Sequence, residues 1–172
     1  QFGNVDAPRT VHVATSPARD LVDEDFGEGV DAEEHELDTF GIRSIAWDAA
    51  KGLLLNGVPT KVKGFANHQD FAGVGVAVPD ALQTYRVWRI KQMGANAWRT
   101  AHNPPTPALL DECDKQGLLV WDENHRNEQT PDMLDDLRSL VLRDRNHPSI
   151  VMWSLCNEAL CDGFDTATAA VL

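Results

Sequence analysis

Hydrophobic positions change their spacing along the chain, from short β-like runs to a repeated alternation of strands and helices. In the first part, short apolar runs at 10–15 and 40–46 flank an acidic loop. These runs predict β-strands, and we interpret residues 1–48 as the closing strands of a β-sandwich whose earlier strands precede this chain. From there on the pattern predicts strands and helices in turn, so residues 49–172 are expected to form a second unit.

A hairpin is predicted at the start of this second unit. Asn56-Gly57, within residues 51–64, suits the positive-φ positions of a type I′ turn. Four strands are then predicted, over residues 62–66, 95–99, 118–122 and 150–155. The third is apolar without interruption at its centre, which is typical of a strand buried on both faces.

Three helices are predicted between these strands, each with start or stop signals. The first covers 79–93 and stops at Gly94. The second has Thr106 as its cap and ends at Gly117, and the third starts at Thr130. Their expected apolar stripes are Leu82, Tyr85, Ile90 and Met93; Leu109, Leu110 and Cys113; and Leu134, Leu137 and Val141.

Parallel strands covered by helices on their outer face follow from this alternation, and both a doubly wound sheet and a (β/α)8 barrel satisfy it. Each predicted strand ends in a polar cluster, and no GxGxxG loop follows any of them. Functional residues gathered at the C-terminal ends of several strands are typical of barrel enzymes. We therefore predict an α/β fold, the N-terminal part of a TIM (β/α)8 barrel. The clusters are Asn67, His68, Gln69 and Asp70; Arg99, His102 and Asn103; Asp122, Glu123, Asn124 and His125; and Asn157 and Glu158.

Composition narrows the function classes. The chain is 42% apolar and 24% charged, as globular proteins are, and its formal charge of −12 argues against a nucleic-acid partner. No apolar run is long enough for a membrane span, and neither a signal peptide nor a compartment can be assigned. Three cysteines without a CxxC pair predict packing roles for Cys113 and Cys156 rather than a disulfide framework. Because the sequence begins with Gln1, we expect a piece of a longer chain.

The fourth strand ends unusually, in the stretch RNHPSIVMWSLCNE over residues 145–158. A carboxylate is a poor β-former and is seldom buried without a partner, so Asn157 and Glu158 at the end of an apolar strand indicate a functional pair. Trp121 and Trp153, inside their strands, are expected to pack in the barrel rather than to stack on a ligand.

This stretch resembles the acid/base signature of glycoside hydrolase family 2, the β-galactosidase, β-glucuronidase and β-mannosidase group. GFANHQD, MGANAWRTAHNPP and GLLVWDE are similar to the first three barrel strands of that family, in the same order. TFGIRSIAWD and LLLNGVPTKVKG resemble its junction between an immunoglobulin-like domain and the barrel. The resemblance implies that residues 1–48 end an immunoglobulin-like β-sandwich and that residues 49–172 hold barrel strands one to four.

The resemblance also implies roles for site residues. Glu158 would be the general acid/base, which partial burial at the strand end would help to keep protonated. Asn157 would bind the sugar 2-hydroxyl. Arg99 is a cation whose burial would be too costly without a carboxylate, so it is expected to orient an active-site acid and is also a candidate sugar contact. The further candidates for sugar contacts are His102, His68, Asp70 and Asn103. For His68 and Asp70, ordering of their own loop is an equal alternative.

Neither a metal nor a cofactor is predicted. Glu123 and His125 are two possible ligands without a third at readable spacing. In the family the nucleophile is a second Glu on the seventh barrel strand, so no residue of this chain is assigned that role. Pairing of Glu158 with Asp70 or Glu123 instead is disfavoured, because neither comes from across the barrel.

The expected function is retaining hydrolysis of terminal β-D-galactosyl or related β-glycosyl residues by the full-length parent, with this chain inactive alone. The partner is then a carbohydrate, and homo-oligomeric assembly of the parent stays open. A β-glucuronidase or β-mannosidase of the same family and a non-catalytic carbohydrate-binding module are the competing hypotheses. A cellulase-like barrel hydrolase shares the Asn-Glu pair but lacks the preceding sandwich.

Overall fold

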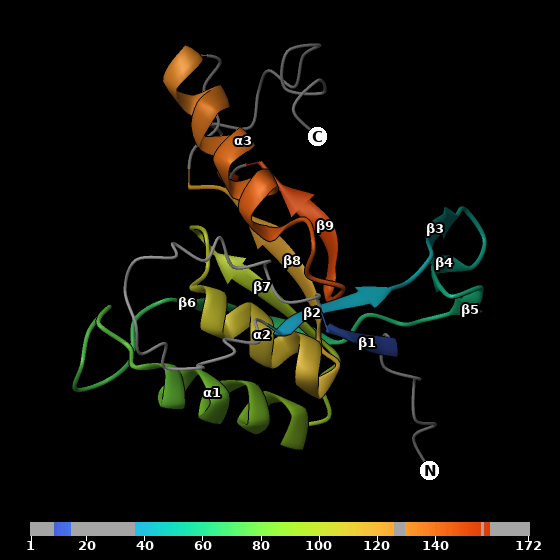
Figure 1. Ribbon diagram of the computed structural model, residues 1–172, viewed down its shortest axis with the longest axis horizontal. Helices are drawn as coiled ribbons and strands as arrows, with labels where there is room; N and C mark the ends of the chain where they lie inside the picture. The colour runs from blue at the N-terminus through green and yellow to red at the C-terminus, as the bar shows by residue number, and fades with distance from the viewer. Residues whose placement is uncertain (1–8, 15–36, 126–129, 156, 159–172) are drawn as a thin grey trace, which may run out of the picture.

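The computed structural model of the chain describes residues 9–14, 37–125, 130–155 and 157–158 (Figure 1). A parallel sheet of four strands is its largest part. The strands are β6 (Gly64–His68), β7 (Ala97–Ala101), β8 (Leu119–Glu123) and β9 (Ile150–Ser154). Each lies within two residues of a predicted strand.

The parallel sheet has the order β6-β7-β8-β9, which is the order of the chain. The connections are the helices α1 (Asp80–Gln92), α2 (Pro107–Gln116) and α3 (Pro131–Asp144). A doubly wound sheet reverses its strand order at a switch point, and no reversal occurs among these four strands. The topology is therefore that of a barrel sector, as predicted.

The main core lies between the sheet and the helices, with α1 and α2 side by side (Figure 1). Trp98 and Val120 from the strands meet Val87 of α1 and Leu110 of α2, all at most 2% exposed. Burying such side chains contributes about 1.5–3 kcal/mol each. Trp153 is half-buried against this cluster, which confirms its packing role.

The stripe predicted for α1 was wrong in part. Tyr85 and Met93 are exposed, and the buried face carries Gln83, Val87 and Ile90. A buried glutamine is tolerated here because its amide donates to Thr106 Oγ1 (3.3 Å) and accepts from Arg86 (3.2 Å).

The other two helices follow their predicted stripes more closely. In α2 the buried residues are Leu109, Leu110 and Cys113, as predicted. In α3, Leu137 and Val141 are buried, whereas Leu134 is only half-buried. Thr106 and Thr130 occupy the N-cap positions of α2 and α3, as predicted, yet neither makes a side-chain cap hydrogen bond.

The predicted hairpin forms a three-stranded antiparallel sheet of β3 (Ile45–Asp48), β4 (Gly52–Leu55) and β5 (Val58–Pro59). Asn56 and Gly57 have φ of 52° and 79°, which confirms the positive-φ turn. Leu53 and Leu55 pack on Ala97 and Leu119, near the N-terminal ends of β7 and β8. The hairpin therefore covers the end of the sheet opposite the polar clusters.

The run predicted as one strand at 40–46 is divided between β2 (Leu37–Ile42) and β3. The division follows from Ser44, whose N–H and C=O bind Asn56 of the hairpin turn at 2.9 Å each. Since β3 pairs with β4, the hairpin spans the proposed domain division after residue 48, which stays a prediction.

The remaining strand, β1 (Arg9–Ala14), pairs antiparallel with β2. This pair agrees with a β-sandwich, whose immunoglobulin-like nature stays a prediction. Cys113 is buried with a free thiol, and Cys156 and Cys161 lie outside the described residues. Among the helices described, none is long and apolar enough to cross a membrane.

Candidate active site

The predicted site residues lie at one edge of the sheet because the C-terminal ends of parallel strands meet there. His68 ends β6, Glu123 ends β8 and Asn157 follows β9. Arg99 lies within β7, and His102 follows that strand directly. The structure therefore gathers residues that are as many as 89 positions apart in the sequence, from His68 to Asn157.

A network of charged hydrogen bonds joins three of these residues. Arg99 Nε donates to Glu123 Oε2 at 2.7 Å, and His102 Nδ1 lies 2.6 Å from Glu123 Oε1. Glu123 is fully buried, whereas Arg99 and His102 keep 24% and 33% of their side chains exposed. The buried Glu123 carboxylate therefore holds Arg99 and His102, whose side chains remain partly exposed to solvent. Arg99 has a carboxylate partner, as expected of a partly buried cation, and its role in orienting an active-site acid stays a prediction.

Asn157 joins this network through Arg99. Arg99 Nη2 donates to Asn157 Oδ1 at 3.0 Å, linking the ends of β7 and β9. The Asn157 amide nitrogen is then the group left to donate to a ligand.

Glu158 is exposed, so its expected partial burial was wrong. The reason is its position after β9, which is an edge strand of the described sheet and has a neighbouring strand on one side only. Glu158 has φ of 63°, in the left-handed region that few non-glycine residues adopt. Such a conformation costs about 1–3 kcal/mol and is frequent at functional sites.

Trp121 of β8 contacts Arg99 through its ring. The Arg99 guanidinium carbon lies 5.1 Å from the centre of the indole ring, within range of a cation–π contact. The ring remains 41% exposed among the described residues, so packing of Trp121 in the complete barrel stays a prediction. It lies on the open face of the sheet, where the four described strands leave it uncovered.

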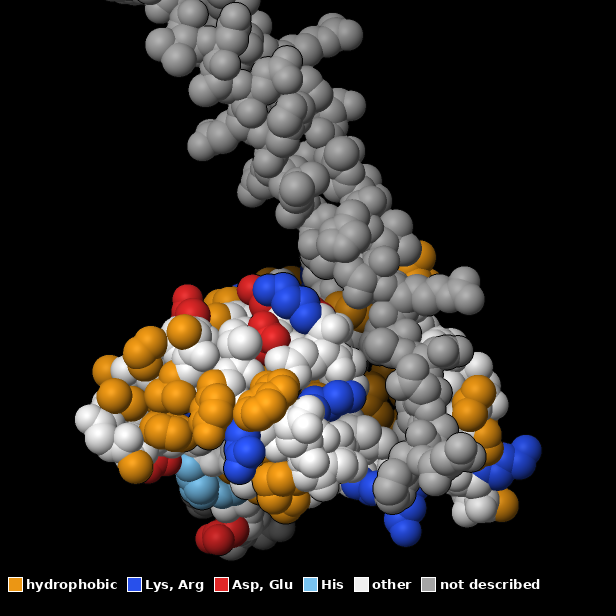
Figure 2. All heavy atoms as spheres, turned by 90° about the horizontal axis from the view of Figure 1, so that it is seen from below, with side chains coloured by type: hydrophobic (Ala, Val, Ile, Leu, Met, Phe, Trp, Pro, Cys, Tyr) orange, Lys and Arg blue, Asp and Glu red, His pale blue; other side chains and the backbone are white. Residues whose placement is uncertain are grey.

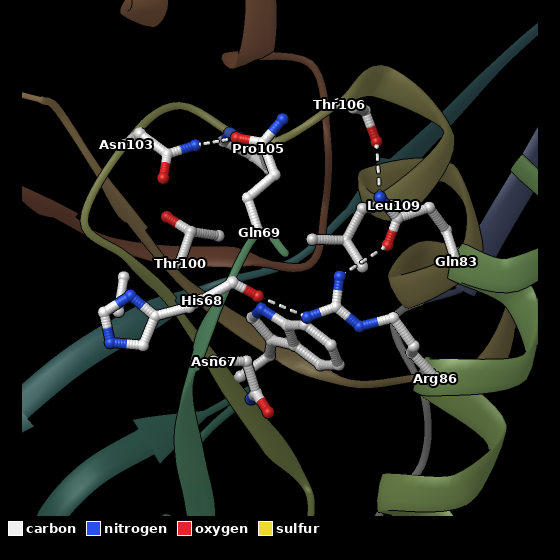
Figure 3. Close-up of a pocket in the computed structure, with 12 residues that line it drawn as sticks. Asn67, His68, Gln69, Gln83, Arg86, Thr100, Asn103, Pro105, Thr106 and Leu109 are labelled. Carbon is white, nitrogen blue, oxygen red and sulfur yellow. Dashed lines mark hydrogen bonds between the residues drawn. The ribbon is translucent and has the colours of Figure 1, made fainter. Parts of the chain in front are cut away.

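His68, Asp70 and Asn103 differ in how close they come to the Glu123 network. The His68 ring meets the His102 ring edge-on with centroids 5.2 Å apart, and it points away from Arg86, which binds the His68 carbonyl (Figure 3). Asp70 is exposed and its charge acts on Arg86, raising a pKa that burial mainly lowers. Only His68 therefore borders the Glu123 network.

Asn103 faces another partner. Its amide donates to Gln69 Oε1 and to the Pro104 carbonyl, the latter at 2.9 Å, and Asn103 lines the small pocket shown in Figure 3. Its hydrogen bonds thus order the loops after β6 and β7.

Sequence reasoning missed two hydroxyl groups that complete the network. Ser154 Oγ donates to Glu123 Oε2 at 2.9 Å, and Thr100 Oγ1 accepts the Glu123 backbone N–H at 2.8 Å. Serine and threonine inside predicted strands carry no signal that separates them from ordinary strand residues. Glu123 itself was weighed only as a metal ligand or an improvised nucleophile.

Two further buried carboxylates, those of Asp122 and Asp144, lie next to the Glu123 network. Asp122 is 0% exposed and Asp144 is 1% exposed. The Arg143 guanidinium donates to both carboxylate oxygens of Asp144, each at 2.6 Å. Burial, together with the charge of Asp144 and a hydrogen bond to it, raises the pKa of Asp122 to about 8. No donor among the described residues reaches Asp122 Oδ2. The pair can therefore bond only by sharing a proton.

Within the described residues no three histidine, cysteine or acidic side chains are grouped as a metal site would need. Glu123 is occupied by Arg99, His102 and Ser154, and His125 Nδ1 lies 3.2 Å from the His102 carbonyl. The absence of a metal or cofactor stays a prediction.

A family model described as "Glycosyl hydrolases family 2, TIM barrel domain" matches residues 48–129 and 124–171. Beta-galactosidase BoGH2A of Bacteroides ovatus is 42% identical over 132 residues, which are 70% of this chain and 16% of that protein. Beta-glucuronidase of Mus musculus is 35% identical over 130 residues, 69% of this chain and 20% of that protein.

Solved structures agree with these matches. A glycosyl hydrolase family 2 member from Bacteroides cellulosilyticus has a TM-score of 0.66 at 40% identity, covering 72% of this chain and 18% of that one. A GH2 beta-galacturonidase from Eisenbergiella tayi bound to galacturonate has a TM-score of 0.64 at 39% identity, covering 71% and 23%. The chain thus spans a fifth or less of the two curated relatives. It belongs to glycosyl hydrolases family 2 and carries part of the TIM barrel domain of that family.

Proposed function

We propose that the whole protein carrying this chain is a retaining exo-β-glycosidase that removes terminal β-D-galactosyl residues. One observation carries this proposal. The Asn157-Glu158 pair stands at the end of a parallel strand, and Asn157 is tied to Arg99 and, through it, to Glu123 and His102. Membership of family 2 supports the glycosidase chemistry.

Glu158 is the proposed general acid/base. A retaining glycosidase needs one carboxyl group to protonate the leaving oxygen and a second carboxylate about 5–5.5 Å away to attack the anomeric carbon. The family resemblance assigns the second group to a seventh strand, so Glu158 acts with a residue outside this chain. Asn157 would donate its amide N–H to the sugar 2-hydroxyl, since its oxygen is held by Arg99. His102, Arg99, His68, Asp70 and Asn103 are the further proposed contacts.

Galactoside is proposed over glucuronide as the substrate. The segments HQDFAGVGVAVPD and HNPP resemble the galactosidase-like branch, and the B. ovatus relative is named a beta-galactosidase. A glucuronide brings a carboxylate that needs a cation. Of the described arginines near these strand ends, Arg99 of β7 is engaged by Glu123, and Arg86 of α1 is engaged by Gln83 and the His68 carbonyl.

A β-glucuronidase is the second candidate, because the mouse relative carries that name. The E. tayi neighbour, bound to galacturonate, is also described as a beta-galacturonidase, so an acidic sugar is the ligand of one similar structure. A β-mannosidase and a module that binds sugar without cleaving it are weaker candidates, since no contact in the described residues favours either.

The test is Glu158→Gln in the whole protein, assayed with nitrophenyl β-galactoside, β-glucuronide and β-mannoside. We expect the galactoside to be the best substrate and the substitution to lower its kcat/KM by about 10²–10⁴-fold. A dinitrophenyl glycoside should be less affected, because its leaving group needs little protonation. Glu112→Gln on α2 is the matched control and should leave activity unchanged.

Product configuration and binding separate these candidates. Proton NMR of the first product should show the β anomer; an α product would contradict a retaining mechanism. A preference for the glucuronide would transfer the proposal to the second candidate. Sugar binding without turnover and unaffected by Glu158→Gln would indicate a binding module instead.

A further inference from the structure

The carboxylate of Glu123 receives donors from both neighbouring strands. Arg99 Nε and Ser154 Oγ both reach its Oε2, at 2.7 and 2.9 Å, and His102 Nδ1 reaches its Oε1 at 2.6 Å. Its side chain is 0% exposed. Glu123 therefore cannot touch a substrate itself, and any effect on one must pass through the residues that it holds.

The donors around Glu123 decide the tautomer of His102. A carboxylate has only lone pairs to offer, so the His102 nitrogen 2.6 Å from Oε1 must carry a hydrogen. Arg99 Nη2 also lies 3.4 Å from His102 Nδ1. An Nδ1 that accepted from Arg99 would place two lone pairs face to face at 2.6 Å, which is unfavourable. Neutral His102 is therefore the Nδ1–H form, and its Nε2 is an acceptor for a sugar hydroxyl.

Glu123 also fixes the orientation of the Asn157 amide, through Arg99. Because Glu123 and the Trp121 ring hold the Arg99 guanidinium in place, Arg99 Nη2 points at Asn157 Oδ1, 3.0 Å away. The Asn157 amide is then oriented with its NH2 group available as a donor. One buried carboxylate thus sets an acceptor on His102 and a donor on Asn157.

We propose that Glu123 is a positioning residue that fixes the hydrogen-bond polarity of His102 and Asn157 toward the sugar. This inference rests on the proposed function for its kinetic consequence, but its structural consequence can be measured without activity. It assigns to Glu123 a role distinct from those of a metal ligand or a nucleophile.

Glu123→Gln is the informative substitution because it preserves shape and removes one acceptor. Arg99 and Ser154 both donate to the Oε2 position, so the glutamine must place its oxygen there. Its NH2 group then faces His102 Nδ1, which must lose its hydrogen and accept. We expect His102 to change from the Nδ1–H to the Nε2–H form.

Asp122→Asn is the matched control. Asp122 is the adjacent residue in β8 and is equally buried, but its side chain bonds Thr100 and Asp144 and makes no hydrogen bond to Arg99, His102 or Asn157 in the described residues. Both variants are compared by thermal unfolding, so that a loss of stability common to the two is not mistaken for loss of positioning.

The primary measurement is solid-state NMR of the whole protein labelled with ¹⁵N-histidine, at about pH 8.5 so that neutral tautomers are compared. His102→Gln identifies the signal. The proposal expects a tautomer change in Glu123→Gln and none in Asp122→Asn. An unchanged His102 signal in Glu123→Gln, or the same change in both variants, would overturn it.

Kinetics supply the second measurement. Glu123→Gln should lower kcat/KM at least tenfold in the wild-type background and much less in a His102→Ala background, because the effect passes through His102. Equal losses in both backgrounds would contradict that route. If the wild-type protein hydrolyses no β-glycoside, the proposed function fails, and the tautomer result alone then decides the role of Glu123.

Discussion

At the residue scale, the two adjacent carboxylates of β8 show how strand alternation assigns different chemistry to neighbours. Successive side chains of a strand point to opposite faces of the sheet. Glu123 therefore meets Arg99, whereas Asp122 meets the buried Asp144. The first is neutralised by a cation, and the second is favoured in its protonated form.

Protonation of Asp122 predicts how stability depends on pH. Its folded-state pKa of about 8 lies above the unfolded value of about 3.9, so the folded protein holds a proton that the unfolded chain releases. The contribution of this group to stability is fully present below about pH 4 and is lost as pH rises to about 8. The loss is at most about 1.4 kcal/mol per pH unit.

Asp122→Asn should remove this dependence, because the amide stays neutral. We expect the variant to gain stability relative to wild type as pH rises from about 5 to about 8, measured as the urea midpoint of the whole protein. Asp135→Asn, at an exposed position of α3, should retain the wild-type slope. Parallel curves for wild type and Asp122→Asn would show that Asp122 is ionised in the folded state.

At the element scale, contact between β6 and β7 depends on a glycine. A Cβ built on Gly64 would lie 2.8 Å from Ala97 Cβ and closer still to the Ala97 carbonyl oxygen. These two residues are direct partners in the parallel ladder. Because the obstacle includes backbone, a side chain at residue 64 must push the strands apart.

Gly64→Ala is therefore expected to destabilise the protein by about 1–3 kcal/mol through overpacking. The control is Ala66→Ser, two residues along the same strand at an exposed position, which should change stability by less than about 0.5 kcal/mol. Chemical denaturation of the whole protein measures both. Equal stability of Gly64→Ala and wild type would mean that the strands separate there without cost.

Much of this element pattern is readable from the sequence because its signals are local. Gly94 and Gly117 have positive φ after α1 and α2, as their positions predict. The stripe of α1 was less readable, since Gln83 is buried through a bond to Thr106 on another element. Periodicity records which residues are apolar, and it cannot show that a polar side chain has found a partner.

The candidate site is likewise predictable from the sequence only in part. Its location at the strand ends follows from the alternation of strands and helices, and the Asn157-Glu158 pair marks it. The central role of Glu123 does not follow, because it depends on Arg99, His102 and Ser154 meeting across three strands. Contacts of this kind arise from strand register, which is specified by packing of the whole sheet.

At the scale of the whole molecule, the chain exposes surfaces that barrels and bundles ordinarily cover. β6 and β9 are the edge strands of the described parallel sheet. Figure 2 shows hydrophobic side chains gathered on the face that carries α1, where Tyr85 and Trp88 are 46% and 44% exposed. Unpaired edges and large apolar patches favour association with other chains.

We therefore predict that the isolated 172-residue chain self-associates and does not hydrolyse β-glycosides. Association should appear as a rise in weight-average mass with concentration in sedimentation equilibrium, and Trp88→Lys should reduce it by placing a charge on the apolar face. Inactivity is expected because Glu158 needs a second carboxylate on the opposite side of the sugar, and no described residue comes from there. Turnover of nitrophenyl β-galactoside by the isolated chain, lost on Glu158→Gln, would contradict this. Such turnover would mean that Asp70 or a second copy of the chain in an assembly supplies the nucleophile.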